Sequence, residues 1–406
     1  MRIVVTGGGS GGHITPVLAV AHELKQLQPS AQIDYIIQTG DALGDIPEHD
    51  KHIDHVYSVR AGKFRRYHGA GVRQLFDVPT LYKNLRDAVW VVVGLWQSFW
   101  LLGRLRPDVI FIKGGFVGVP VGLAAALRHI PYVTHDSDAM PGLANRLIAP
   151  WARVHAVALP KDIYTYPPGK TVTVGVPIAR FFRPLTAVAI KQLRSHLQLS
   201  EAGRLLLVTG GGNGARRLNQ AVLTCAADLL VRYPDLWIVH IAGRLEEAAM
   251  RQQYKQELSP KEHQRVVVKG FVTNLHEYSG AADVIVTRAG GTSIAEFAAQ
   301  AKPCVVVPNP ELAGGHQLKN AQVLADRKAV KLVSEGILKD DFYALMPALT
   351  DLFDNPDKAK LLGKRLATLA RPNAAHLLAV LLLEVVSTKT LDDPGQLKDP
   401  AKNTHS

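Results

Sequence analysis

The first residues that could do chemistry stand in a glycine-rich loop near the start of the chain. The segment TGGGSGGHITPV, which begins at Thr6, has the spacing Gly7-x-Gly9-x-x-Gly12, and His13 follows directly. Glycines let the backbone come close to a ligand, and a helix that begins here turns its N–H groups toward an anion. A helix N-terminus lowers the pKa of a histidine, so we expect His13 to be a neutral proton acceptor. The pattern fits a general base, and it also fits local helix capping.

The same glycine spacing is found in nicotinamide-dinucleotide sites, but the sequence around it does not fit one. Such a site needs an acid roughly 20 residues beyond the glycines, at the end of the second strand, to hold the ribose. Here Gln38 stands at that place, and Asp34 lies at the beginning of the strand. We therefore expect no nicotinamide cofactor.

A second chemical pattern lies in RAGGTSIAEFAAQA, which begins at Arg288. The backbone at Gly291 and the hydroxyls of Thr292 and Ser293 suit a diphosphate at a helix N-terminus. Glu296 follows one turn into that helix, where a carboxylate can accept two hydrogen bonds from a ribose diol. An acid near a helix N-terminus is also favourable without any ligand.

Further segments in the second half of the chain carry groups suited to a nucleotide sugar. Gln317, beside His316 at the start of a predicted helix, can read sugar hydroxyls, although helix capping explains it equally well. The loop GGGNG at 210–214 is a second glycine-rich loop whose backbone can come close to a ligand. The backbone at Val272 could form hydrogen bonds with the edge of a nucleotide base.

Composition narrows the class of protein and of partner. The 406 residues carry a formal net charge of +12, which favours an anionic partner. Cys225 and Cys304 are the only cysteines, so a reducing, cytoplasmic setting fits better than a disulfide framework. The start of the chain does not resemble a signal peptide. The apolar run at 88–103 falls short of the roughly 20 residues of a membrane span, so we expect a buried or interfacial helix.

The positive charge is concentrated between Arg60 and Arg73, a segment that has five basic residues and no acid. A membrane surface, a nucleic acid or a solvated loop would each explain it. The docking residues that we predict here are Lys63, Phe64, Arg65 and Arg66.

Strand–helix alternation must position these groups. Buried apolar strands are expected at 2–6, 33–37 and 107–115, and the pattern restarts with RLLLVTGGG at 204–212. Such alternation predicts an α/β protein with parallel sheets. We predict two Rossmann-like, doubly wound domains that face each other across a cleft and meet near 175–184. The polar segment at 389–406 is expected to be a disordered tail.

These segments also carry a family resemblance. The chain resembles the bacterial N-acetylglucosaminyltransferases that make lipid II in cell-wall synthesis (MurG-type, glycosyltransferase family 28). The similar segments, in the order and at the spacing of the family, are GGGSGGHITPVLAVA, PDVIFIKGGFVGVPVGLAAAL, GLANRLIA, GGGNGARRLNQ, ADVIVTRAGGTSIAEFAA and HQLKNA. The resemblance implies the GT-B architecture. It implies an N-terminal acceptor and membrane-side domain at 1–174 with a returning helix at about 373–388, and a UDP-sugar domain at 175–370.

By this resemblance, the donor is UDP-GlcNAc and the acceptor is lipid I, the undecaprenyl-pyrophosphoryl-MurNAc-pentapeptide. The reaction is an inverting hexosyl transfer to the C4 hydroxyl of MurNAc. His13 is the implied base, and Asp138 is a second candidate. The implied donor-binding residues are Ser10, Gly11, Gly12, Asp138, Arg180, Gly212, Val272, Gly291, Thr292, Ser293, Glu296 and Gln317. No metal, cofactor or nucleic acid is expected, and the implied location is peripheral, on the cytoplasmic face of the inner membrane.

The chain departs from the family pattern at three places. The loop after the strand at 131–134 reads HDSD where the family usually has His-Glu-Gln-Asn, so Asp138 replaces an amide, and an ionised carboxylate cannot donate a hydrogen bond. Gly212 stands where a serine is expected. Ala179 replaces an arginine, with Arg180 beside it. These departures bear on the exact donor contacts and the identity of the acceptor, and not on the fold or the nucleotide-sugar class. Three alternatives remain open: a related transferase with another lipid acceptor, a UDP-GlcNAc 2-epimerase, and a binding subunit without a working base.

Overall fold

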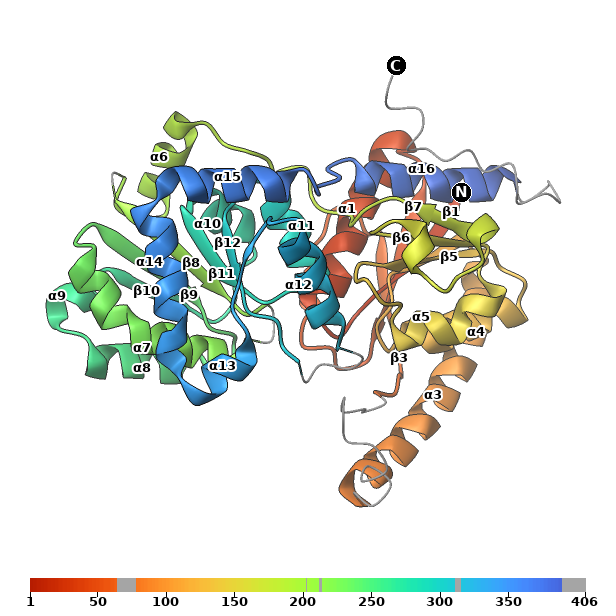
Figure 1. Ribbon diagram of the computed structural model, residues 1–406. Helices are drawn as coiled ribbons and strands as arrows, with labels where there is room; N and C mark the ends of the chain where they lie inside the picture. Colours follow the sequence, from red (N-terminus) through yellow and green to blue (C-terminus); the bar gives the residue numbers. More distant parts are fainter. Residues whose placement is uncertain (64–77, 202, 212–213, 311–314, 389–406) are drawn as a thin grey trace. The chain divides into compact units, whose positions relative to one another are not determined.

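The computed structural model describes residues 1–63, 78–201, 203–211, 214–310 and 315–388, with the backbone alone for 78–83. Phe64, Arg65, Arg66, Gly212 and the predicted tail lie outside the described residues. The chain forms two compact units (Figure 1). The first contains Met1–Ala179 and the segment from Arg371 onward, and the second contains Arg180–Pro310 and Gln317–Ala370.

The N-terminal unit is built on a seven-stranded parallel sheet with the order β3-β2-β1-β4-β5-β6-β7. Its strands are β1 (Arg2–Thr6), β2 (Gln32–Gln38), β3 (His55–Val59), β4 (Val109–Ile112), β5 (Tyr132–Asp136), β6 (Val154–Val157) and β7 (Thr171–Thr173). The central strands are apolar runs buried on both faces, as parallel sheets require. Strand β1 begins and ends where the sequence predicts it.

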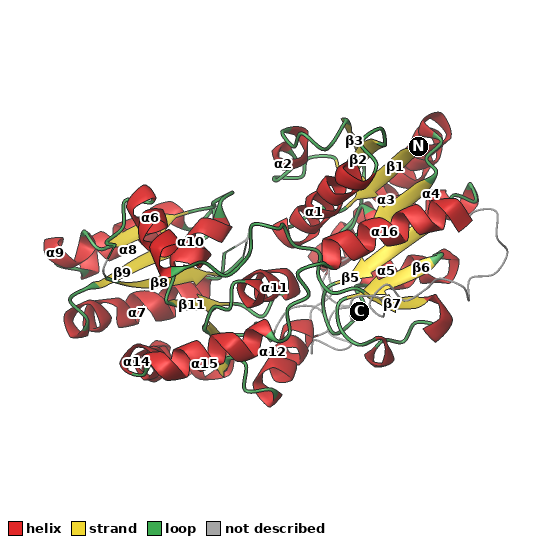
Figure 2. Cartoon of the chain, turned by 90° about the horizontal axis from the view of Figure 1, so that it is seen from above, coloured by secondary structure: helices red, strands yellow, loops and turns green. Residues whose placement is uncertain are grey.

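Helices cover both faces of this sheet (Figures 1 and 2). They are α1 (Gly11–Leu27), α2 (Asp45–Glu48), α3 (Val78–Leu105), α4 (Gly118–Leu127), α5 (Leu143–Ile148) and α16 (Ala374–Ser387), with short 3-10 turns at Ala149–Trp151, Lys161–Ile163 and Pro168–Lys170. On one face α3, α4 and α5 enclose a core with Val4, Ile110 and Ile112. The last helix, α16, packs beside α1, so the end of the described chain returns to this unit.

The C-terminal unit repeats the plan with a six-stranded parallel sheet of order β10-β9-β8-β11-β12-β13. Its strands are β8 (Arg204–Thr209), β9 (Leu236–Ile241), β10 (Val266–Lys269), β11 (Val284–Thr287), β12 (Cys304–Val306) and β13 (Lys331–Leu332). Its helices are α6 (Ala187–His196), α7 (Arg216–Arg232), α8 (Glu247–Glu257), α9 (Pro260–His263), α10 (Leu275–Ala281), α11 (Gly291–Ala299), α12 (His316–Asp326), α13 (Glu335–Asp340), α14 (Met346–Asp354) and α15 (Pro356–Ala367), with a 3-10 turn at Phe342–Leu345. Two buried apolar clusters fill its two faces, and Cys225 and Cys304 lie inside them as free thiols.

Both sheets are doubly wound, and this confirms the predicted fold class. The strand order reverses between β1 and β4 in the first unit and between β8 and β11 in the second. Ligands of such sheets bind outside the carboxyl ends of the strands at this reversal. The loops after β1, β4, β8 and β11 are therefore the first places to look for a site.

Helix α3 is longer than the apolar run from which we expected a buried or interfacial helix. The apolar run at 88–103 looked too short for a membrane span, but the helix around it is longer, because Asn84, Arg86 and Asp87 are also helical. The segment Asn84–Leu105 is long and apolar enough to cross a membrane by length and composition, and 22% of its most apolar stretch is buried. Figure 1 shows the first part of α3 extending away from the sheet.

Candidate functional site

The glycine loop after β1 brings His13 to the carboxyl edge of the N-terminal sheet. Helix α1 begins at Gly11, so His13 lies in its first turn. A Cβ at Gly7 would collide with the carbonyl oxygen of His13, and Gly9 has a φ of +80°. Both positions therefore need glycine for this loop to close under the histidine. Asp41 holds the loop from outside by accepting a hydrogen bond from the Gly9 N–H at 2.6 Å.

The hydrogen bonds of His13 decide which ring nitrogen is available. Its Nδ1 lies 3.1 Å from the carbonyl oxygen of Gly8 and 3.1 Å from the hydroxyl of Ser10. A carbonyl can only accept, so Nδ1 carries the proton and Nε2 keeps its lone pair. Burial, and secondly the positive charge of Lys113, lower the pKa of His13 to about 4. The imidazole is therefore neutral near pH 7, with Nε2 as a proton acceptor.

Sequence reasoning missed Lys113, the residue directly after β4. Lys113 is only 3% exposed, and burial lowers the pKa of its ammonium group. The charges of Asp136 and Asp138 act in the opposite direction but do not reverse this shift. Among the described residues Lys113 makes no side-chain hydrogen bond. The available signal was a lysine between an apolar strand and two glycines, in FIKGG, where a surface charge is the ordinary interpretation. The fold instead places a buried cation next to the candidate base.

The end of β5 and the loop after it contribute two carboxylates with different tasks. Asp136 is buried and accepts hydrogen bonds from the Gly142 N–H, the Asn145 amide and the Tyr166 hydroxyl at 2.9, 3.0 and 2.8 Å. These bonds make it a structural anchor for the loop. Asp138 is half-buried, and its charge raises the pKa of His13, which places it near the imidazole.

Polar atoms at this edge are left for a ligand. The hydroxyl oxygen of Ser137 and the amide oxygen of Asn145 are buried, and neither has a hydrogen-bond partner in the described part of the chain. A buried polar atom without a partner costs free energy, which a bound polar molecule can recover. Asp136 and Asp138 have an Asp-x-Asp spacing. Over the described ranges, however, no three His, Cys, Asp or Glu side chains come together in a way that could hold a metal ion.

The C-terminal unit offers a different kind of group in Glu296. Helix α11 begins at Gly291, directly after the switch strand β11, and Glu296 lies on its buried face with 6% exposure. Burial raises the pKa of this carboxyl to about 8. It has no hydrogen-bond or ion-pair partner among the residues that the structure describes. A buried carboxyl that the protein itself does not use is suited to accept hydrogen bonds from a ligand.

A hydrogen-bond network holds the turn before α11, whose N-cap residue is Gly290. Arg288 donates to Glu335 at 2.6 Å and to the carbonyl of Val307 at 3.1 Å. The Asn320 amide, from α12, donates to the carbonyl of Ala289 at 2.9 Å. These bonds fix the turn between β11 and α11. Gly291, Thr292 and Ser293 follow it as the first residues of α11.

Gln317 is positioned by the backbone. Its side-chain oxygen accepts a hydrogen bond from the Asn309 N–H at 2.9 Å, and the residue is 7% exposed. The amide NH₂ is then the end that remains for a ligand. Val272 follows β10 at the edge of the sheet and is half-buried, and Arg180 is exposed. The structure thus collects Ser10, Gly11, Gly12, His13 and Asp138 at one sheet edge, and Gly291, Thr292, Ser293, Glu296 and Gln317 around β11 and β12.

Comparison with protein families gives two matches that together span most of the chain. Residues 3–157 match the glycosyltransferase family 28 N-terminal domain, and residues 205–378 match the glycosyltransferase family 28 C-terminal domain. The two matches fall on the two sheets described above.

Individual relatives agree along the full length. The UDP-N-acetylglucosamine–N-acetylmuramyl-(pentapeptide) pyrophosphoryl-undecaprenol N-acetylglucosamine transferase of Moorella thermoacetica is 32% identical over 96% of this chain and 100% of its own. The transferase of the same name from Symbiobacterium thermophilum is 32% identical, over 93% and 95%.

Solved structures share the fold. A crystal structure of Acinetobacter baumannii MurG superposes with a TM-score of 0.65 at 23% identity, over 94% of this chain and 99% of that one. The UDP-GlcNAc 2-epimerase of Neisseria meningitidis, bound to UDP-GlcNAc, gives a TM-score of 0.62 at 13% identity, over 95% and 100%. At these identities the likeness concerns the fold alone, and it is the GT-B arrangement predicted from the sequence.

Proposed function

The chain belongs to glycosyltransferase family 28, and from that premise we propose that it transfers N-acetylglucosamine from UDP-GlcNAc to the MurNAc C4 hydroxyl of lipid I, giving lipid II. The observation that carries this proposal is the 32% identity to a named lipid II-forming transferase over 96% of the chain and 100% of the relative. The reaction is a step of peptidoglycan synthesis, on which cell shape and division depend.

The donor would be held by the C-terminal unit. Glu296 would accept hydrogen bonds from the ribose diol, because its carboxyl is buried and unused by the described protein groups. The diphosphate would lie at the N-terminus of α11, against Gly291, Thr292 and Ser293. The Gln317 NH₂ would donate to the sugar, and the backbone at Val272 would meet the uracil. Ser10 to Gly12 and Arg180 complete the proposed donor contacts, together with Gly212 outside the described residues.

The acceptor would meet His13. In the inverting step, the C4 oxygen of MurNAc forms a bond to C1 of GlcNAc while the bond from C1 to the UDP oxygen breaks. The hydroxyl proton moves to Nε2 of His13, whose lone pair is available because Nδ1 donates to Gly8. Burial, and secondly the charge of Lys113, keep the ring neutral before the reaction. Asp138 is the alternative base, since its charge also lies near the imidazole.

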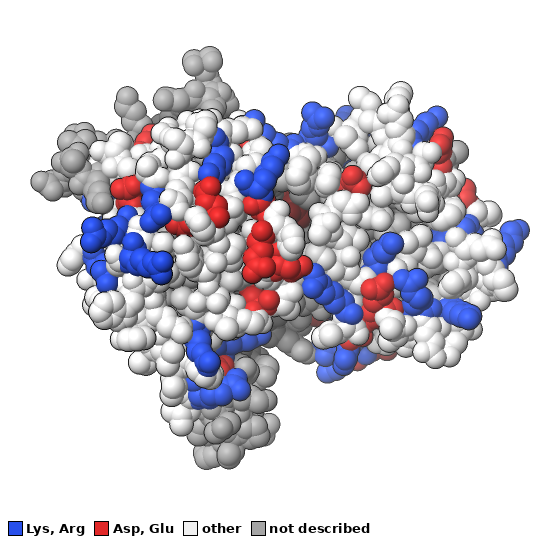
Figure 3. Space-filling model, turned by 180° about the vertical axis from the view of Figure 1, so that it is seen from behind, with Lys and Arg blue, Asp and Glu red and all other residues white. Residues whose placement is uncertain are grey.

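A lipid acceptor requires contact with a membrane, and α3 offers a surface for it. Leu85, Val89, Val92, Trp96 and Trp100 are between 55% and 66% exposed and follow one another at helical spacing. Seen from behind, Lys and Arg side chains gather among white residues where the described part of the N-terminal unit projects downward (Figure 3). We place the enzyme at the cytoplasmic face of the membrane, docked peripherally through this stripe. Lys63 and the basic residues after it would add attraction to anionic lipid.

One coupled assay tests the function. UDP release is followed with UDP-GlcNAc alone, with lipid I added, and with a glycolipid of another class added, and the sugar products are identified. The proposal predicts UDP release and a disaccharide product with lipid I only. Release of UDP with free ManNAc in the absence of acceptor would identify a 2-epimerase. Transfer to the other glycolipid but not to lipid I would identify a different acceptor class.

A further inference from the structure

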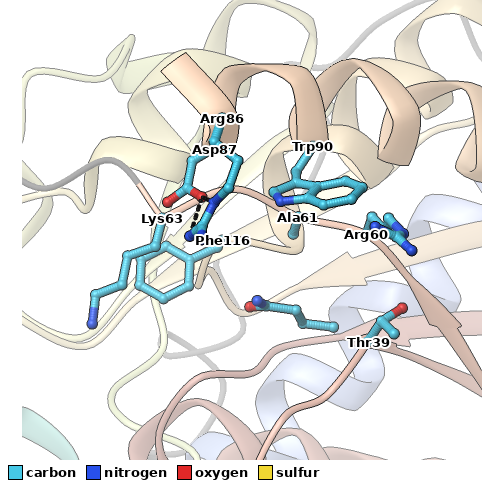
Figure 4. Close-up of a pocket in the computed structure, with 9 residues that line it drawn as sticks. Thr39, Arg60, Ala61, Lys63, Arg86, Asp87, Trp90 and Phe116 are labelled. Carbon is cyan, nitrogen blue, oxygen red and sulfur yellow. Dashed lines mark hydrogen bonds and ion pairs between the residues drawn. The ribbon is translucent and has the colours of Figure 1, made fainter. Parts of the chain in front are cut away.

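A pocket of about 400 Å³ lies beside α3 in the N-terminal unit, at the ends of β2 and β3 (Figure 4). Its walls are formed by Gln38, Thr39, Arg60, Ala61, Lys63, Arg86, Asp87, Trp90 and Phe116. We propose that this pocket binds the diphosphate of the lipid-linked acceptor. The inference rests on the proposed function and deepens it, because it assigns a recognition site to a part of the acceptor that His13 does not touch.

The charge of the pocket suits a diphosphate diester. The lining has three basic side chains and one acidic one, a net charge of +2 against the two negative charges of the ligand. Arg86 is paired with Asp87 at 3.0 Å. Arg60, by contrast, is exposed, and its guanidinium has no acidic partner among the described residues. An arginine fork is well matched to phosphate oxygens, and such bonds are stronger than neutral ones.

Aromatic rings hold the cations in place. The guanidinium of Arg60 lies 3.8 Å from the ring centre of Trp90, and the ammonium of Lys63 lies 5.4 Å from that of Phe116. Figure 4 shows the two rings between the two cations, along one wall of the pocket. Cation–π contacts of this kind restrict long side chains, so less conformational entropy is lost when an anion binds.

The position of the pocket fits the order of the acceptor's parts. The Phe116 ring lies against Gly9, since a Cβ added at Gly9 would be 3.2 Å from it, so the pocket adjoins the loop that carries His13. On the other side, α3 supplies Arg86 and Trp90 to the pocket and the exposed apolar stripe next to them. Sugar hydroxyl, diphosphate and polyprenyl chain follow in the same order as base, pocket and stripe.

The test uses the full-length protein, two pocket variants and one matched control. Arg60→Gln and Arg86→Gln each remove a pocket cation, whereas Arg104→Gln removes an exposed cation of α3 outside the pocket. Each is assayed with a water-soluble, short-chain MurNAc-pentapeptide acceptor in two forms, one with a diphosphate and one with a monophosphate linkage. Arg60→Lys, which keeps the charge, and a thermal unfolding curve for every variant report on folding.

We expect Arg60→Gln to raise KM for the diphosphate acceptor roughly 10- to 100-fold, as the loss of charge-assisted hydrogen bonds does. KM for UDP-GlcNAc should stay constant, and the preference for diphosphate over monophosphate should fall by a similar factor. Inorganic pyrophosphate should compete with the acceptor in the wild type and much less in the variant. Arg86→Gln should act in the same direction, and Arg104→Gln should match the wild type.

Three results would overturn the proposal. The first is an equal loss on both acceptors, and the second is the same effect in Arg104→Gln. The third is an unchanged KM for the diphosphate acceptor in Arg60→Gln; if binding to acceptor-free phosphatidylglycerol vesicles weakens in that variant, the pocket is a phospholipid head-group site instead. Failure of the wild type to transfer GlcNAc to either acceptor is a separate outcome and would overturn the proposed function itself.

Discussion

The Nδ1 of His13 lies 3.1 Å from the carbonyl oxygen of Gly8, in the same glycine loop, so the loop that closes beneath the ring also selects its tautomer. Because Nδ1 is engaged in this bond, Nε2 is available as the base. His13 should therefore affect turnover and not the affinity for the donor. We expect His13→Ala to lower kcat about 10²- to 10⁴-fold. Affinity for UDP, measured by titration calorimetry, should stay within about twofold.

Asp138→Ala is the matched comparison for this prediction, since Asp138 is the other candidate base. If His13→Ala keeps its turnover and Asp138→Ala loses it, the proton goes to Asp138. Loss in both variants would show that the carboxylate supports the imidazole.

Burial, and secondly Lys113, should set the acid limit of the reaction by lowering the pKa of His13. At a pH below the pKa of its imidazole, His13 is charged and cannot act as a base. We therefore expect kcat/KM to fall as the pH is lowered through the pKa of His13. With a pKa of about 4, activity should persist well below pH 6.5. Lys113 lowers this pKa, so Lys113→Met should move the acid limb to higher pH. Asp138 raises it, so Asp138→Asn should move the limb the other way. Rate profiles between about pH 3 and pH 8 check both directions, and shifts of the same sign in the two variants would contradict the assignment.

Glu296 should cost the free protein stability at neutral and alkaline pH. Its folded-state pKa of about 8 lies above the ordinary 4.5, so the folded state holds a proton that the unfolded state has released. Stability is therefore full below about pH 4.5 and falls as the pH rises toward 8, by up to about 5 kcal/mol. Glu296→Gln should remove this loss. It should also weaken UDP binding by roughly 0.5–1.5 kcal/mol for each hydrogen bond lost, since the carboxyl is neutral near pH 7.

Urea unfolding at pH 5 and pH 8 measures the first effect, and UDP titration measures the second. Glu257→Gln, an exposed carboxylate of the same unit, is the control and should change neither. If Glu296→Gln binds UDP as the wild type does, the carboxyl has no part in the ribose site.

The fold could be predicted from the sequence because apolar periodicity and glycine-rich turns depend only on residues close together in the chain. Strand β1 ends at Thr6 as expected, and α11 begins at Gly291 in the turn expected to open that helix. It missed Lys113 because burial is a property of the fold: one lysine among glycines looks like a surface charge. The basic segment that begins at Arg60 is a similar case. Its composition could not show that Arg60 lies over Trp90, a residue 30 positions away on α3.

The pocket depends on a close approach of α3 to the segment after β3. A Cβ added at Gly94 would collide with the carbonyl oxygen of Arg60. Gly94→Ala should therefore push the helix away, with a loss of about 1–3 kcal/mol in unfolding free energy and weaker acceptor binding. Gly169→Ala is the control, since an added Cβ there meets nothing within 4 Å. A stable Gly94→Ala variant with normal acceptor KM would show that the helix can shift without disturbing the pocket.

The last prediction separates the two proposed contributions to membrane docking. Trp96 and Trp100 are 66% and 60% exposed on α3, and their rings contact each other at a centroid distance of 6.3 Å. Changing both to Gln should weaken binding to vesicles equally at low and high salt, because burial of apolar surface is not screened. Changing Lys63, Arg65 and Arg66 to Gln should weaken binding to anionic vesicles at low salt only, because salt already removes that attraction. Leu245→Gln, which removes a 93% exposed side chain from the other unit, is the apolar control. Vesicle co-sedimentation should therefore show one salt-independent and one salt-dependent loss, while turnover on a soluble acceptor stays constant in the tryptophan variant. Unaltered sedimentation of the tryptophan variant would leave the stripe without a role at the membrane. A tryptophan effect that disappears at high salt would mean that α3 acts by positioning charges and not by entering the lipid.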